Sequence, residues 1–345
     1  MFGTYRLLLA FNVVLFHLLA IPAIGPLAVY SFFILSGYLM THIMHNTYGY
    51  TGRGFWGYVK NRYYRLFPMY WLLLTFTLLL VIVGTETQSL AVHEKLKIPA
   101  TAEEWFANIF MIFPELLPVE YPVRLLPASW ALTIELFFYL LIGMGISRNK
   151  FLTTLWFLAS VIYLVATIIT TKEIGFGYGS IFTASLPFSM GAMLYFYKDN
   201  LQNLLANKLL SLQALTVYFV LNLVTVVYCT NIQLEGLWKV VFVSEGLNLV
   251  LSALMTLSLI NTKTDNKVIR KIDTFLGDLS YPVYLVHWTG SLAVFLLLGH
   301  SGSYNIAYFL LSLVVTFGVS ILVNHLLDKR LQKKRSVIKK QLTVS

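Results

Sequence analysis

Ten apolar runs, each close to twenty residues long, occupy most of this 345-residue chain. A helix of about 20 residues crosses the hydrocarbon core of a bilayer, where only helices and closed barrels satisfy every backbone polar group. The predicted fold class is therefore an all-α polytopic bundle of about ten transmembrane helices. The runs are residues 5–24, 27–44, 66–84, 128–146, 152–171, 178–197, 208–229, 238–260, 277–298 and 304–327.

The composition excludes an ordinary soluble domain. Hydrophobic residues make up 58% of the chain and charged residues only 12%, too little polar surface to cover a globule. The first run contains Asn12 and His17 and leads almost directly into the second, so we interpret it as a retained helix rather than a cleaved signal peptide. Cys229 is the single cysteine, which excludes an intrachain disulfide framework and a cysteine-based metal site, and we expect no metal.

The basic residues predict an orientation. With a cytoplasmic N-terminus, 20 of the 25 lysines and arginines lie on the inner side, as the positive-inside rule requires, and both termini are then cytoplasmic. The chain divides into a membrane domain, 1–328, and a basic cytoplasmic tail, 329–345. We interpret the tail as a topology signal near anionic lipid head groups, not as a nucleic-acid-binding segment.

The longest connection on the outer side is predicted at residues 85–127. Its centre, EEWFANIFMIFP, is apolar but too short to cross a bilayer. We expect an interfacial or re-entrant helix at this point.

A few ionisable residues lie inside the predicted spans, where burial is costly and usually marks function. His17 follows Arg6 by eleven residues, about 16 Å further along one helix and on nearly the same face. We interpret His17 as functional, whereas Arg6 taken alone could be a snorkelling anchor. Glu135 enters from the opposite side. His287 belongs to a polar stripe, and interhelical packing and a chemical role are equally good interpretations of it.

Two arginines precede the third run. Arg62 and Arg65 are three residues apart, so they share a face if this segment is helical. Guanidinium groups suit phosphate binding, but the same residues also serve the positive-inside rule, and their spacing leaves both interpretations open.

Five motifs in order resemble the acyltransferase 3 family of integral-membrane O-acyltransferases. They are the arginine and histidine separated by ten residues, FFILSGY, RYYRLFPMYW, SWALTIELFFY and LGDLSYPVYLVH. The fourth carries SW where the family pattern has WS. The resemblance covers nearly the whole chain.

The resemblance implies an enzyme that moves an acyl group, usually acetyl, from cytoplasmic acetyl-CoA to a hydroxyl. The implied acceptor is a cell-surface polysaccharide or a lipid-linked glycan such as an undecaprenyl-linked saccharide. The implied location is a bacterial cytoplasmic (inner) membrane, with membrane lipid and acyl-CoA as further partners and no nucleic acid. The sequence does not indicate the oligomeric state.

The family motifs and the charge pattern together assign roles to individual residues. His17 is the expected general base, and a covalent acyl-histidine intermediate is the less favoured alternative. Glu135 is the second expected catalytic residue, either orienting His17 or contacting the sugar. Acyl-CoA is expected at Arg6, Arg62 and Arg65. The expected site-lining residues are Ser36, Tyr70, Trp130, Tyr139, Tyr281, Tyr284 and His287.

Two other functions are compatible with buried histidine and glutamate in a helical bundle. One is a proton-coupled membrane transporter, and the other is a glycan flippase without acyl chemistry. Consumption of an acyl donor would distinguish the enzyme from both.

Overall fold

The computed structural model describes residues 1–113, 123–171, 180–201, 203, 208–262, 264–299 and 305–343, and this part of the chain is helical and contains no strand. The all-α prediction is confirmed. Part of the predicted connection 85–127 and the first residues of the runs predicted at 178–197 and 304–327 lie outside the described residues.

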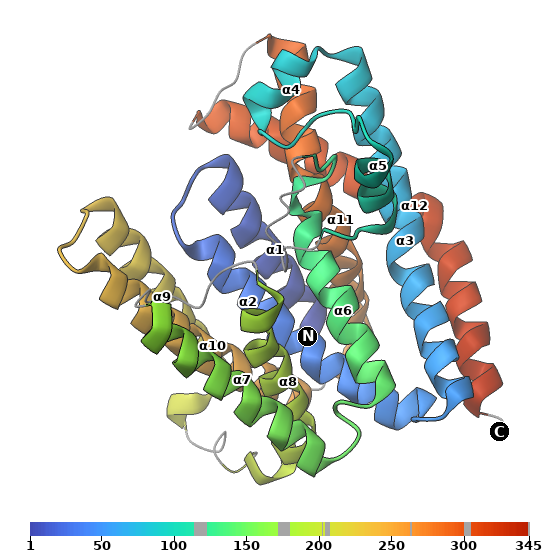
Figure 1. Cartoon of the computed structure of the whole chain (residues 1–345), viewed down its shortest axis with the longest axis vertical. Coiled ribbons are helices and arrows are strands. Elements are labelled where there is room, and N and C mark those ends of the chain that lie inside the picture. The colour runs from blue at the N-terminus through green and yellow to red at the C-terminus, as the bar shows by residue number, and fades with distance from the viewer. Residues whose placement is uncertain are drawn as a thin grey trace.

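Each of the ten apolar runs coincides with a helix (Figure 1). Eight of the described helices are long and apolar enough to cross a membrane, so the chain is a multi-pass membrane protein. The eight do not include α1, which has 17 residues, or α8. The helices are α1 Phe2–Leu18, α2 Ile24–Ile43 with the π turn η1 Met44–Tyr48, α3 Gly52–Val83, α4 Glu86–Val92, α5 Ala102–Phe110, the 3-10 turn η2 Pro127–Ser129, α6 Trp130–Met144, α7 Lys150–Thr171, α8 Ile181–Leu201, the 3-10 turn η4 Lys208–Leu210, α9 Leu212–Asn231, α10 Leu237–Asn261, α11 Lys267–Leu298 and α12 Ile306–Thr343.

Three helices extend well beyond the predicted apolar runs. α3 begins at Gly52 rather than at residue 66, because the Thr51 hydroxyl caps it by accepting the Gly54 N–H. α11 begins at Lys267, where the Asn266 side chain is the cap. α12 continues without interruption to Thr343. Hydropathy marks only the part of a helix that lies in lipid, so these polar extensions carried no apolar signal.

The first helix is shorter than predicted. α1 ends at Leu18 rather than at residue 24, because Ala20 and Ala23 adopt left-handed backbone conformations, with φ of 50° and 66°. His17 therefore lies in the last turn of α1 and not halfway along a longer helix.

The short helices of the outer connection occupy one end of the bundle. α4 and α5 lie at the opposite end from the chain termini (Figure 1). A capping box formed by Thr101 and Glu104 starts α5, and Phe106 and Phe110 on it remain exposed. A nine-residue helix with an exposed apolar face fits the predicted interfacial helix better than a re-entrant one.

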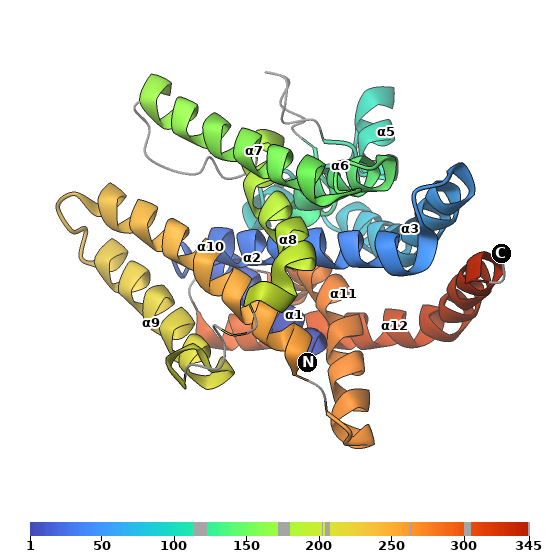
Figure 2. The same cartoon turned by 90° about the horizontal axis from the view of Figure 1, so that it is seen from below.

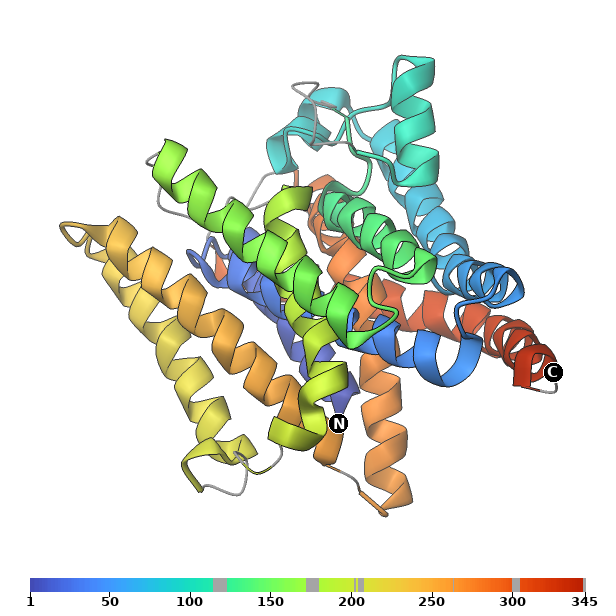
Figure 3. The same cartoon turned by 60° about the horizontal axis from the view of Figure 1, so that its bottom comes forward.

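The centre of the bundle is formed by α1, α2, α8 and α11. α1 packs against α2 and α11, and α2 packs against α8. Seen from below, α9 and α10 extend to one side of this group and α3 and the end of α12 to the other (Figure 2). The same separation is visible in the tilted view (Figure 3).

A trans cap attaches the start of α1 to α11. The first N–H groups of a helix lack intrahelical acceptors, and Met1 provides no side-chain cap. The Asp273 carboxylate of α11 accepts from the Gly3 and Thr4 N–H groups at 3.2 and 2.9 Å and from the Thr4 hydroxyl at 2.9 Å. Gly3 and Gly277 allow the contact, since a Cβ on Gly3 would lie 1.7 Å from the Asp273 backbone oxygen.

Replacing Asp273 with alanine should lower the free energy of unfolding by about 1–2 kcal/mol, because the first N–H groups of α1 lose their acceptors. The measurement is the apparent melting temperature of purified protein in detergent. Asp265→Ala, an exposed carboxylate just before α11, is the control and should leave it unchanged. Equal stability of the two variants would contradict the capping role.

Candidate functional site

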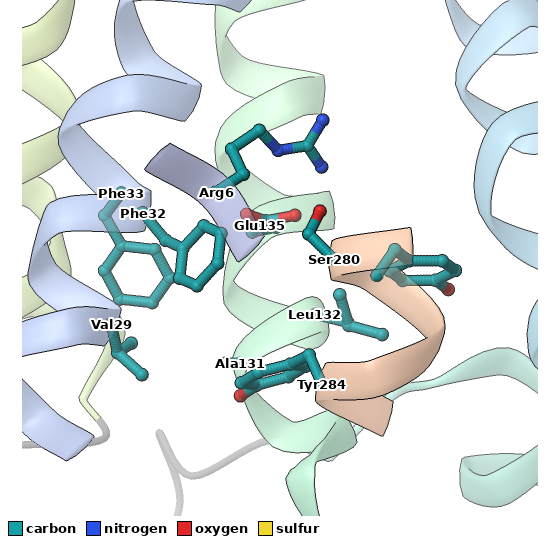
Figure 4. A pocket seen from close by; sticks show the side chains of 10 residues that line it. Arg6, Val29, Phe32, Phe33, Ala131, Leu132, Glu135, Ser280 and Tyr284 are labelled. Carbon is teal, nitrogen blue, oxygen red and sulfur yellow. The ribbon is translucent and has the colours of Figure 1, made fainter. Parts of the chain in front are cut away.

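Two adjoining cavities lie within the bundle beside α1. The inner cavity lies between α1, α2, α6 and α11 (Figure 4). The second, which we call the arginine cavity, has a volume of about 230 Å³ and is lined by Arg6, Arg62, Arg65 and Arg335 together with uncharged residues and Glu135. Arg6 and Glu135 line both cavities, so the two spaces lie side by side.

The guanidinium groups of α3 face the arginine cavity. Arg62 donates to the Asn61 side-chain oxygen at 3.1 Å, and its buried Nε has no acceptor among the described residues. Arg65 forms an ion pair with Asp278 of α11 at 3.6 Å. A partly unsatisfied guanidinium beside a cavity is suited to an anionic ligand.

Glu135 is held by two hydroxyl groups. Ser36 of α2 donates to one carboxylate oxygen at 2.9 Å, and Tyr139, one turn further along α6, donates to the other at 3.0 Å. Arg6 and Glu135 both line the inner cavity (Figure 4). The partly buried carboxylate is thus the acidic group on the lining of both cavities, and its two hydroxyl partners hold it in place.

His17 and His287 form a hydrogen-bonded pair. The His17 Nδ1 and His287 Nε2 atoms are 2.8 Å apart, and the two rings are stacked with a 10° interplanar angle. His287 Nδ1 lies 2.8 Å from the Tyr284 backbone oxygen, which only accepts, so this nitrogen carries a proton. In the neutral pair His287 Nε2 then accepts from His17 Nδ1–H, and His17 Nε2 is left with a free lone pair, as a general base requires.

Aromatic rings and a third histidine surround the pair. Trp288 lies 5.2 Å from the His17 ring, between centroids, and 4.6 Å from the ring of His93, which follows α4. His93 Nδ1 accepts the Lys95 N–H at 3.1 Å. His93, at the start of the chain between α4 and α5, therefore packs on Trp288, which lies against the histidine pair.

Most of the predicted site-lining residues lie beside these cavities. Ser36 and Tyr139 line the arginine cavity, Tyr281 lines both, and Tyr284 lines the inner one. Tyr70 lines neither, because its hydroxyl donates to the Asn108 backbone oxygen of α5 and joins α3 to that helix.

The remaining predicted residues are grouped differently from expectation. Trp130 is the first residue of α6 and is absent from the lining of both cavities. Glu135 does not orient His17, since its oxygens bond Ser36 and Tyr139 and His17 bonds His287. His287, in the polar stripe of α11, is therefore the hydrogen-bond partner of His17.

Sequence reasoning missed Asp278, His93 and Arg335. Asp278 lies inside a quoted motif, but its pairing with Arg65 depends on how α3 and α11 pack. His93 lies outside the apolar runs, and Arg335 belongs to a segment whose charges had a sufficient explanation in topology. None of the three has a local pattern that would separate it from an ordinary surface residue.

The comparison with protein families decides the assignment. The family model described as "Acyltransferase domain" matches residues 4–325, which is nearly the whole chain. The chain belongs to the acyltransferase 3 family. It is thus a membrane acyltransferase, and the inner cavity, the histidine pair and the arginine cavity, apart from Arg335, are formed by residues within the matched domain. No curated protein and no solved structure matches the chain closely enough to add to this assignment.

Glu135→Leu should lower the free energy of unfolding of this acyltransferase by about 1–3 kcal/mol, because the Ser36 and Tyr139 hydroxyls lose their acceptor. Glu135→Gln should cost less, since an amide oxygen can still accept one of them. Apparent melting temperatures in detergent test this, with the exposed Glu103→Leu as control. A leucine variant as stable as the parent would contradict the role of this network.

Stability should fall as the pH decreases from about 6.5 to about 4. Burial lowers the pKa of His93 from 6.5 to about 4, and the positive charges of Lys95 and Arg124 contribute less to this decrease. The folded protein therefore binds fewer protons than the unfolded chain in this interval, and acid favours unfolding by about 1–3 kcal/mol.

His93→Gln should flatten this part of the profile of apparent melting temperature against pH, whereas the exposed His325→Gln should not. A profile of His93→Gln that runs parallel to that of the parent protein would show that His93 does not contribute.

Proposed function

We propose that this acyltransferase moves an acyl group, by default acetyl, from cytoplasmic acyl-CoA to a hydroxyl group of a cell-surface polysaccharide or lipid-linked glycan. The observation that carries the proposal is the order of charged and titratable groups along α1 and α11. An arginine-lined cavity lies at one end of these helices, and a histidine with a free lone pair lies further along them.

The arginine cavity suits the phosphate groups of the donor. Arg62 and Arg65 project from α3 and Arg6 projects from α1 into the same space. Guanidinium groups bind phosphate oxygens through paired, charge-assisted hydrogen bonds. The predicted positive-inside orientation puts this cavity on the cytoplasmic side, where acyl-CoA is available.

The inner cavity provides a route for the acyl-bearing arm. It continues from Arg6 and Glu135 to Tyr284, whose backbone oxygen bonds His287. A thioester that enters past Arg6 would therefore reach the neighbourhood of the histidine pair with its phosphates still among the arginines. An acceptor hydroxyl would reach His17 from the outer end, where His93 and Trp288 are located.

The proposed chemistry requires only the neutral histidine pair. His17 Nε2 takes the proton of the acceptor hydroxyl as its oxygen attacks the thioester carbonyl carbon. The new carbon–oxygen bond forms, the carbon–sulfur bond breaks, and the sulfur leaves as CoA thiolate, which takes the proton from His17. His287 holds the His17 ring by accepting from the His17 Nδ1–H. This hydrogen bond becomes stronger when His17 takes up the proton, because its donor is then positively charged.

The transporter and flippase alternatives differ from the enzyme in that neither requires an acyl donor. Either protein would move its substrate without consuming acetyl-CoA, and neither gives the histidine pair a chemical task. Membership of an acyltransferase family does not favour them.

His17→Ala should reduce the transfer rate by about 10²- to 10⁴-fold, the usual contribution of a general base. Purified protein in nanodiscs would be mixed with acetyl-CoA, and the release of free CoA thiol would be followed. The assay would be run without an acceptor and with a saturating concentration of an oligosaccharide acceptor. Binding of acetyl-CoA should persist in the variant, because the arginine cavity is intact.

The exposed His325→Ala is the matched control and should have the parent rate. An acetyl-histidine adduct detected by mass spectrometry would replace the base mechanism with a covalent one. A parent protein that neither binds nor consumes acetyl-CoA would overturn the proposed function and favour a carrier.

A further inference from the structure

The family match ends at residue 325, but the helix that contains this residue does not. α12 continues to Thr343 and carries the basic segment KRLQKKRSVIKK away from the last apolar turn. The sequence alone gave this segment only a topological role. The structure instead packs α12 against α3 and against the η1 turn that follows α2.

A buried asparagine joins the extension to the arginine motif of α3. Asn61 is fully buried, and its side-chain oxygen accepts from Arg62 at 3.1 Å and from Arg335 Nε at 3.4 Å. Its amide nitrogen lies 3.4 Å from the Arg335 backbone oxygen, to which it donates. The Asn61 side chain thus contacts guanidinium groups from two helices, and it is 274 residues from Arg335 in the sequence.

Arg335 completes a positively charged wall. It lines the arginine cavity together with Arg6, Arg62 and Arg65, while Glu135 is the acidic residue on that lining. Burial, followed by the charges of Arg335, Arg62 and Arg65, lowers the pKa of Lys339, one turn further along the extension. Like charges held this close repel one another, so an arrangement of this kind is stabilised by a multiply charged anion.

We propose that the C-terminal extension of α12 is part of the donor site and that Arg335 binds a phosphate group of acyl-CoA. This inference rests on the proposed function. Acyl-CoA carries a diphosphate and a separate ribose phosphate, and two guanidinium groups from different helices can contact phosphates that no single motif reaches. The extension therefore makes donor affinity depend on residues outside the family-matched region.

The test is the dissociation constant of acetyl-CoA for the full chain in phosphatidylcholine nanodiscs, measured by isothermal titration calorimetry. Arg335→Ala should weaken binding by about tenfold to a hundredfold, the usual effect of removing a charge-assisted hydrogen bond. In turnover assays the variant should raise KM for acetyl-CoA and leave kcat nearly unchanged. Lys333→Ala, an exposed residue of the same extension, should match the parent protein.

A second substitution separates loss of binding from loss of folding. Arg335→Gln keeps a side-chain amide that can still donate to Asn61 but removes the charge, so it should retain the parent melting temperature and show the same loss of affinity. Parent-like affinity of folded Arg335→Ala or Arg335→Gln would overturn the proposal. An equal loss in Lys333→Ala would overturn it as well, because general positive charge would then be the cause.

An anionic lipid head group presents the same phosphate chemistry, and a second arm distinguishes it. If Arg335 serves lipid instead, its replacement should weaken binding of short-chain phosphatidylglycerol to the detergent-solubilised protein and leave acetyl-CoA binding unchanged, which would overturn the proposal. A parent protein that does not bind acetyl-CoA at all would contradict the proposed function itself, a result distinguishable from failure of the Arg335 variants alone.

Discussion

The close approach of α1 to α11 is the contact on which the rest of the site depends. Gly3 and Gly277 bring the two backbones together, and Asp273 caps the first turn of α1. With its start attached, α1 lies along α11 and presents Arg6 beside Tyr281 and His17 beside His287. Displacing α1 would therefore disturb both the cavity wall and the histidine pair.

Charge is distributed along this pair of helices in a consistent order. Guanidinium groups gather at one end, the partly buried carboxylate of Glu135 lies next along these helices, and the imidazoles of His17 and His287 lie further on. The arginine end can hold an anion, and the imidazole region can accept and return a proton. A region suited to anions and a region suited to proton exchange are thus separated along the length of the bundle.

Much of the candidate site could be predicted from the sequence, because ionisable residues are rare within membrane-spanning segments. Arg6, His17, Glu135 and His287 are ionisable groups within apolar runs, and their burial cost together with the family motifs made them candidates. Tyr70 belonged to an equally clear motif, yet its hydroxyl serves to join α3 to α5. A motif identifies which side chains are unusual but does not distinguish a cavity wall from a helix contact.

The sequence by itself determined the all-α membrane fold, the approximate positions of the ten apolar helices and the acyltransferase family, because apolar length and motif order are local properties of the chain. Only the tertiary structure decided the partners: His287 for His17, the Ser36 and Tyr139 hydroxyls for Glu135, and the contact of Arg335 with Asn61. Such contacts join helices distant in sequence, and they follow from how helix faces pack, which the periodicity of one helix does not specify.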